Sequence, residues 1–132
     1  MCLGLQETHS LRDLHAPEFY QLTSSHYKFK RRGVALLFAK RFFEAPTLVS
    51  RDRQGSEVWA TARWKASGTE WLIGNLHLKG TPATRQVADA RGIARFLENT
   101  LPRRPTIVMG DLNLHPTEWE VEEIKRHHRL RR

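Results

Sequence analysis

The stretch from Thr106 to Pro116, TIVMGDLNLHP, constrains the fold of this chain more than any other part of the sequence. Its apolar run ends at Gly110, and Asp111 and Asn113 follow two residues apart. In an extended backbone residues i and i+2 point to the same face, so the carboxylate and the amide are expected side by side at a strand end. The stretch therefore predicts a strand that presents oxygen ligands where it ends.

Further apolar runs alternate with one clear helical pattern. The helix is predicted to begin after Thr81 and Pro82, good residues for a cap and first turn, and a last segment from Thr117 has acidic residues before basic ones, which suits a helix. The predicted apolar face of the helix after Pro82 carries Val87, Ala90, Ala94, Leu97 and Leu101. Strands are predicted at Leu3 to Gln6, Gly33 to Ala39, Val58 to Trp64, Trp71 to Leu78 and Thr106 to Met109, with a hairpin turn at Ala66 to Thr69.

The order of these elements predicts the fold class. Strands outnumber helices, and hairpin connections occur beside a helical crossover, which indicates an α/β layered fold with a mixed sheet. A chain of 132 residues is long enough for one buried core and too short for two. We therefore expect one domain over residues 1–118, followed by a terminal helix with a basic tail at 119–132.

The charge balance favours a polyanionic partner. The chain has 22 Lys and Arg against 14 Asp and Glu, a formal net charge of +8. Nucleic acid or another acidic surface is the partner that such a balance predicts. Much of the excess is local, because the last eight residues hold five cations and no acid, and a second cluster at Lys28 to Arg32 is equally well explained as a solvated loop.

Cysteine and hydropathy set the expected compartment. A single cysteine, Cys2, excludes an intrachain disulfide framework and favours a reducing compartment. The longest uninterrupted apolar run, Val34 to Ala39, is far too short to span a bilayer, so no transmembrane segment is expected. An intracellular location follows as the expectation.

Four side chains at strand ends could act on a phosphodiester. Carboxylates repel an anionic substrate unless a hard cation such as Mg²⁺ lies between them, and Glu7 would suit such a cation. Asp111 could orient or deprotonate a water molecule, and Asn113 could hold that water or a phosphate oxygen. His77 could donate a hydrogen bond or a proton to the phosphate, and Asn75 would share its face of the strand.

Each of these residues also has an ordinary structural interpretation. Gly110-Asp111 is a common turn dipeptide, and Gln6-Glu7-Thr8 could simply end a strand or cap a helix. An isolated histidine such as His77 is more often a satisfied, half-buried side chain than a catalyst. The functional interpretation is favoured by the order in which Glu, His and Asp-x-Asn occur, each after an apolar run.

That ordered set resembles the endonuclease/exonuclease/phosphatase superfamily, which contains DNase I, the abasic-site endonucleases and the endonuclease domains of non-LTR retrotransposons. The resemblance is carried by LGLQETH at 3–9, RRGVALLF at 31–38, IGNLHL at 73–78 and IVMGDLNLHP at 107–116. It implies a DNase I-like layered α/β sandwich with mixed sheets, of which this chain holds about half.

The resemblance also implies roles for the four residues. Glu7 matches the family's ligand for Mg²⁺, for which Mn²⁺ could substitute. Asp111 and Asn113 match the pair that handles water and phosphate, and His77 matches the histidine that DNase I and some other members use at the phosphate. Members also begin with a strand carrying an Asn and end with a Ser-Asp-His motif. This sequence shows neither, so we expect a member truncated at both ends with impaired activity.

Three functions are therefore open. Metal-dependent phosphodiester hydrolysis by an endonuclease-like domain is the first expectation, with nucleic acid as the partner. A phosphatase or lipid phosphodiesterase of the same fold is the second, with a phosphorylated small molecule or a lipid as the partner. An inactive remnant that binds nucleic acid through its basic tail is the third.

Overall fold

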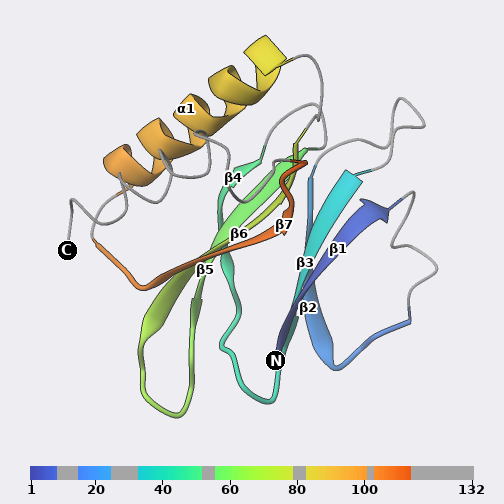
Figure 1. Ribbon diagram of the computed structural model, residues 1–132. Helices are drawn as coiled ribbons and strands as arrows, with labels where there is room; N and C mark the ends of the chain where they lie inside the picture. Colours follow the sequence, from blue (N-terminus) through green and yellow to red (C-terminus); the bar gives the residue numbers. More distant parts are fainter. Residues whose placement is uncertain (9–14, 25–32, 52–55, 79–82, 101–102, 114–132) are drawn as a thin grey trace. The chain divides into compact units, whose positions relative to one another are not determined.

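The computed structural model describes residues 1–8, 15–24, 33–51, 56–78, 83–100 and 103–113 (Figure 1). The chain divides into two compact units, Met1–His77 with Arg104–Asp111 and Leu78–Arg103 with Leu112–Arg132. Several sequence predictions lie outside the described residues: the basic cluster at 28–32, the helix cap at 81–82, and the terminal helix with its basic tail at 119–132.

The first unit contains two sheets (Figure 1). One is antiparallel, with the order β1-β3-β2, and is made by β1 (Cys2–Thr8), β2 (Phe19–Thr23) and β3 (Gly33–Ala39). The other has the order β4-β5-β6-β7 and is made by β4 (Thr47–Arg51), β5 (Glu57–Arg63), β6 (Glu70–His77) and β7 (Thr106–Asp111). Its first three strands are antiparallel and β7 runs parallel to β6, so this sheet is mixed, as predicted.

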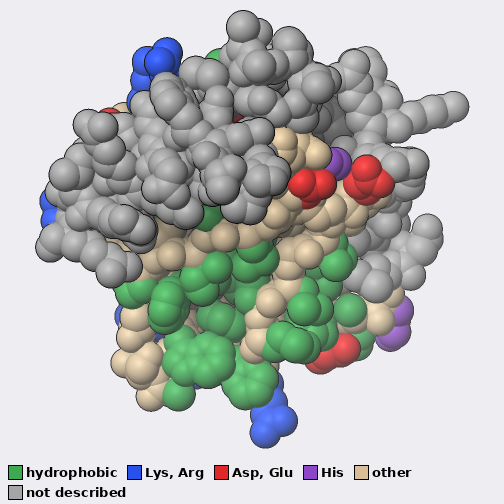
Figure 2. All heavy atoms as spheres, viewed as in Figure 1, with side chains coloured by type: hydrophobic (Ala, Val, Ile, Leu, Met, Phe, Trp, Pro, Cys, Tyr) green, Lys and Arg blue, Asp and Glu red, His purple; other side chains and the backbone are tan. Residues whose placement is uncertain are grey.

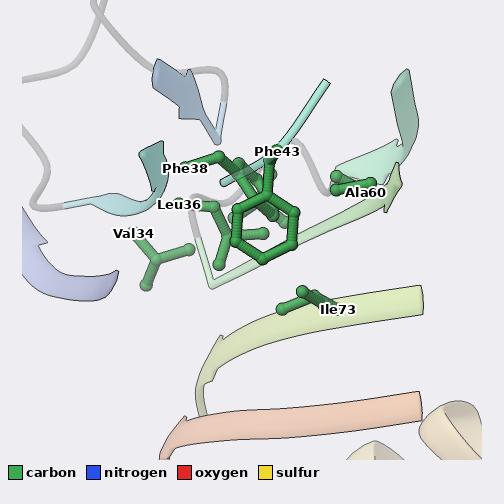
Figure 3. Packing of buried hydrophobic residues seen from close by; sticks show 8 residues of the cluster. Val34, Leu36, Phe38, Phe43, Ala60 and Ile73 are labelled. Carbon is green, nitrogen blue, oxygen red and sulfur yellow. The ribbon is translucent and has the colours of Figure 1, made fainter. Parts of the chain in front are cut away.

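Apolar side chains from both sheets form the core of the first unit. Val34, Leu36 and Phe38 alternate along β3 and point to one face, where they meet side chains of β5 and β6 (Figure 3). Phe43 closes this cluster, with its ring 5.4 Å from that of Phe38 in an edge-to-face arrangement. The two sheets therefore pack face to face as a sandwich. The cluster consists of Val34, Leu36, Phe38, Phe43, Val58, Ala60, Ala62 and Ile73.

The parallel β6–β7 pair is anchored where both strands begin. The Arg104 guanidinium donates a hydrogen bond of 2.6 Å to the Glu70 carboxylate, in a partly buried ion pair. The backbone N–H of Leu72 donates to the carbonyl of Pro105 at 2.9 Å. These contacts fix the register that places the ends of β6 and β7 level with each other.

The second unit contains α1 (Ala83–Asn99), which begins directly after the predicted cap. Ala90 and Ala94 are buried, as their predicted face requires, and Ile93 is buried with them. Leu97 is half-buried, and the side chains of Val87 and Leu101 lie outside the described part of the chain. No helix among the described residues is both long and apolar enough to cross a membrane.

Cys2 packs against the core of the first unit. Burial raises the pKa of its thiol from 9.0 to about 11, although the nearby N-terminal charge acts in the opposite direction. The thiolate is the nucleophilic form of cysteine, so this thiol stays protonated and unreactive near neutral pH. Cys2 is therefore a partly buried packing residue at the edge of the core.

Candidate functional site

The ends of β6 and β7 bring two predicted site residues together. His77 ends β6 and Asp111 ends β7, and the two are register partners in the parallel pair. Partners on neighbouring strands are about 4.8 Å apart and point to the same face of the sheet. That face also carries Ile73 and therefore faces the first sheet. His77 is half-buried, whereas Asp111 is exposed to solvent.

Gln6 connects β1 to this same end of the second sheet. Its Nε2 donates a hydrogen bond of 2.8 Å to the carbonyl of Leu76. A Cβ placed on Gly110 would lie 2.5 Å from the same Nε2. Gln6 therefore touches the residue before His77 and the residue before Asp111, and it is itself the residue before Glu7.

These contacts place three of the four predicted side chains at one end of the sandwich. The three residues in mutual contact are Gln6, Leu76 and Gly110. Each is followed directly in the sequence by a predicted site residue. Figure 2 shows acidic side chains and a histidine on the same face of the molecule. Glu7, like Asp111, is exposed to solvent.

The backbone is strained at two of the predicted site residues. Glu7 has φ 51° and Asn113 has φ 49°, and they are the non-glycine residues with positive φ in the described part of the chain. This left-handed conformation costs a non-glycine residue about 1–2 kcal/mol. Such strain is concentrated at functional sites in proteins, because only a precise local arrangement makes the cost tolerable.

A β-bulge in β1 explains the conformation of Glu7. Leu5 pairs with Ala35 and Thr8 pairs with Gly33, so two residues of β1 lie opposite Val34 alone. The extra residue bends the strand and turns the following side chain away from regular alternation. The sequence predicted a strand from Leu3 to Gln6 with Glu7 at its end, and it gave no sign of a bulge followed by renewed pairing at Thr8.

Asn113 differs from its predicted geometry. β7 ends at Asp111, and with φ 49° the backbone at Asn113 is left-handed, so the expected extended backbone from Asp111 to Asn113 is wrong. Asparagine tolerates this conformation better than most residues because its short side chain can hydrogen-bond locally. Within the second unit its Nδ2 donates to the carbonyl of Leu78 at 2.6 Å. Its predicted role at phosphate stays a prediction.

Asn75 is a structural residue at the centre of the sandwich. It shares the face of His77, as predicted, and is fully buried. Its Nδ2 donates to the carbonyls of Leu5 and Ala35 at 2.9 and 2.8 Å, and its Oδ1 accepts from Gln6 at 2.9 Å. Each such bond contributes about 1 kcal/mol net. Sequence reasoning missed these contacts, because they join residues about 40 to 70 positions apart in the chain.

The donor set fits a magnesium-like ion. Glu7 supplies a carboxylate that could bind the ion directly, and the exposed carboxylate of Asp111 could accept a hydrogen bond from a water molecule of such a site. Gln6 Oε1 has no hydrogen-bond partner among the described residues, but it is buried and stays outside this donor set. Within that part of the chain there is no group of three or more His, Cys, Asp or Glu that could hold a metal ion. Mg²⁺ is usually bound through one or two carboxylates, with water and phosphate completing its shell.

Solved structures of several proteins share this fold. An endonuclease/exonuclease/phosphatase from Bacteroides vulgatus is 23% identical, with a TM-score of 0.74 over 95% of this chain and 56% of that chain. The mannosyl-6-phosphatase Bt3783 of Bacteroides thetaiotaomicron is 19% identical, with a TM-score of 0.72 over 93% and 55%. D. rerio TDP2, complexed with single strand DNA product, is 16% identical, with a TM-score of 0.69 over 94% and 51%.

This chain therefore spans about half the length of these structures. No curated protein matches it. The model of the Endonuclease/Exonuclease/phosphatase family matches residues 2–131, which is nearly the whole chain. Together with the two-sheet sandwich, this match shows that the chain belongs to the endonuclease/exonuclease/phosphatase family.

Proposed function

We propose that this chain carries a Mg²⁺-dependent site for phosphodiester hydrolysis and acts on nucleic acid as a nuclease. The observation that supports the proposal is the mutual contact of Gln6, Leu76 and Gly110, because Glu7, His77 and Asp111 directly follow these residues in the sequence. Mn²⁺ could replace Mg²⁺, because the proposed ligands are oxygen atoms.

Each residue has a distinct proposed role. Glu7 holds the cation, which when bound offsets the negative charge that develops on the phosphate. Asp111 accepts a hydrogen bond or proton from the attacking water, and His77 donates a hydrogen bond to a phosphate oxygen. Asn113, two residues beyond Asp111 in the sequence, holds the water or a phosphate oxygen.

Nucleic acid is preferred as substrate because of charge. A formal net charge of +8 attracts a polyanion and speeds its association. TDP2 from D. rerio, which has the same fold, is described in complex with a single strand DNA product.

A phosphatase is the second candidate. The cation and the carboxylates that hold it do not select the leaving group, because the same arrangement can serve a monoester or a diester. A mannosyl-6-phosphatase is among the proteins that share this fold. A phosphorylated sugar or a phospholipid is therefore the competing substrate class.

Removal of the metal tests the proposal. We expect nicking of supercoiled plasmid in Mg²⁺ to fall at least ~100-fold in EDTA, because a bound cation contributes several kcal/mol of charge stabilisation. The same preparations would be assayed on RNA, inositol phosphates, mannose 6-phosphate and sphingomyelin. Faster turnover of a monoester than of DNA would support the phosphatase.

Two results would contradict the proposal. Cleavage that continues at the same rate in EDTA would remove the cation from the mechanism. Salt-dependent DNA binding without any cleavage, abolished by deletion of residues 125–132, would assign a binding function to the basic tail instead.

A further inference from the structure

A fully buried amide lies behind the proposed site. Asn75 has no exposed surface, and both hydrogens of its Nδ2 are used by carbonyls of the opposite sheet. Those carbonyls belong to Leu5 and Ala35, the last regular pair of β1 and β3 before the bulge. Asn75 therefore ties the second sheet to the position where β1 departs from regular pairing.

The orientation of Asn75 determines the orientation of Gln6. Two of the hydrogen-bond partners of Asn75 are backbone carbonyl oxygens, which can only accept. The NH₂ group of Asn75 must therefore face these carbonyls, and its Oδ1 must face Gln6. Gln6 must then present Nε2, which donates to Oδ1 at 2.9 Å and to the Leu76 carbonyl at 2.8 Å. If the Gln6 amide were flipped, its Oε1 would face two other oxygens, Asn75 Oδ1 and the carbonyl of Leu76. The amides of Asn75 and Gln6 are therefore each fixed in one orientation.

The fixed Gln6 amide lies directly before the strained residue. Gln6 is the first residue of the bulge, and Glu7 follows it with φ 51°. Without these hydrogen bonds, a regular extended backbone would relieve the strain at Glu7.

We propose that Asn75 and Gln6 are positioning residues that hold Glu7 in the backbone conformation from which its carboxylate binds the cation. The inference rests on the proposed function for its last step only. Partners that orient a metal ligand in this way commonly change metal affinity 10- to 100-fold when they are replaced.

The first measurement needs no cation. Backbone NMR shifts of Glu7 in the metal-free full chain report its left-handed conformation. We expect Gln6→Met, which keeps side-chain length and removes the donor, to move these shifts toward values for extended backbone. Gln21→Met is the matched control, because Gln21 lies in β2 of the same sheet and pairs with Leu37, on the face away from the core.

The second measurement uses Mn²⁺ alone as the probe. The dissociation constant, obtained from the EPR signal of free Mn²⁺, is expected to rise about tenfold or more in Gln6→Met and Asn75→Leu. Thr61→Val is the control for Asn75→Leu, because it also replaces a buried polar side chain of this sandwich with an apolar one. All variants would be measured where circular dichroism shows them folded.

The outcomes separate this inference from the proposed function. Unchanged Glu7 shifts in Gln6→Met, or equal loss of Mn²⁺ affinity in Gln21→Met, would overturn the positioning role. If Glu7→Gln binds Mn²⁺ as tightly as the wild type, the proposed cation role of Glu7 fails, while the Glu7 shifts still decide whether the amides fix its backbone. If Asn75→Leu does not fold, Gln6→Met decides the question by itself.

Discussion

Gly110→Ala is expected to destabilise the protein by about 3 kcal/mol or more. Gly110 has φ 125°, and a Cβ there would overlap the backbone carbonyl oxygen of Leu76. The strained backbone costs ~1–3 kcal/mol and the overlap with a rigid neighbour a similar amount. A domain of this size has about 5–15 kcal/mol of stability in total, so the effect is large. Urea unfolding followed by tryptophan fluorescence measures it.

Two other glycines provide matched controls for this substitution. Gly68 also has positive φ, 71°, but a Cβ there meets no atom of the described residues within 4 Å, so Gly68→Ala is expected to cost only about 1 kcal/mol. Gly92 lies in α1, where a Cβ also meets no atom of the described part of the chain within 4 Å, and Gly92→Ala is expected to stabilise by about 0.5–1 kcal/mol. Equal losses in Gly110→Ala and Gly68→Ala would show that contact with Leu76 does not constrain this strand end.

Asp111→Asn is expected to lower the rate of metal-dependent hydrolysis about 10³-fold. The substitution keeps the size of the side chain and removes the carboxylate that accepts the proton of the attacking water, a contribution usually between ~10² and 10⁴. Because Asp111 is exposed, the free energy of unfolding should change by less than about 0.5 kcal/mol. Initial rates in Mg²⁺ and a urea titration of the same preparations measure the two effects.

Asp89→Asn is the control for Asp111→Asn. Asp89 lies in α1, outside the strand ends that carry the site, and its substitution removes the same charge. Its rate should stay within about twofold of the wild type. A comparable loss in both variants would mean that overall charge, rather than a proton acceptor at Asp111, limits the reaction.

The strands of the core could be predicted from the sequence because burial imposes a pattern on them. Gly33 to Ala39 was predicted with the bounds that β3 has, since a central strand buried on both faces is a continuous apolar run. β2 and β4 were not predicted. Both are edge strands with half-buried or exposed side chains, and their conformation is set by pairing with β3 and β5.

The site could be predicted only in part for a similar reason. Strand order and the parallel register bring His77 beside Asp111, and apolar runs ending in polar residues already indicated these positions. The bulge at Glu7 depends instead on Gln6 and Asn75, which are 69 residues apart in sequence. Contacts over such a distance leave no periodic signal, although a buried asparagine within an apolar strand is a reason to look for one.

The most direct test of the proposed site is to locate a bound cation. Crystals of the full chain soaked in Mn²⁺ would be measured for anomalous scattering. We expect a peak coordinated by the Glu7 carboxylate, at the end of the sandwich that carries His77 and Asp111, and no such peak in Glu7→Gln. A peak that persists in Glu7→Gln, or one found only away from these strand ends, would contradict it.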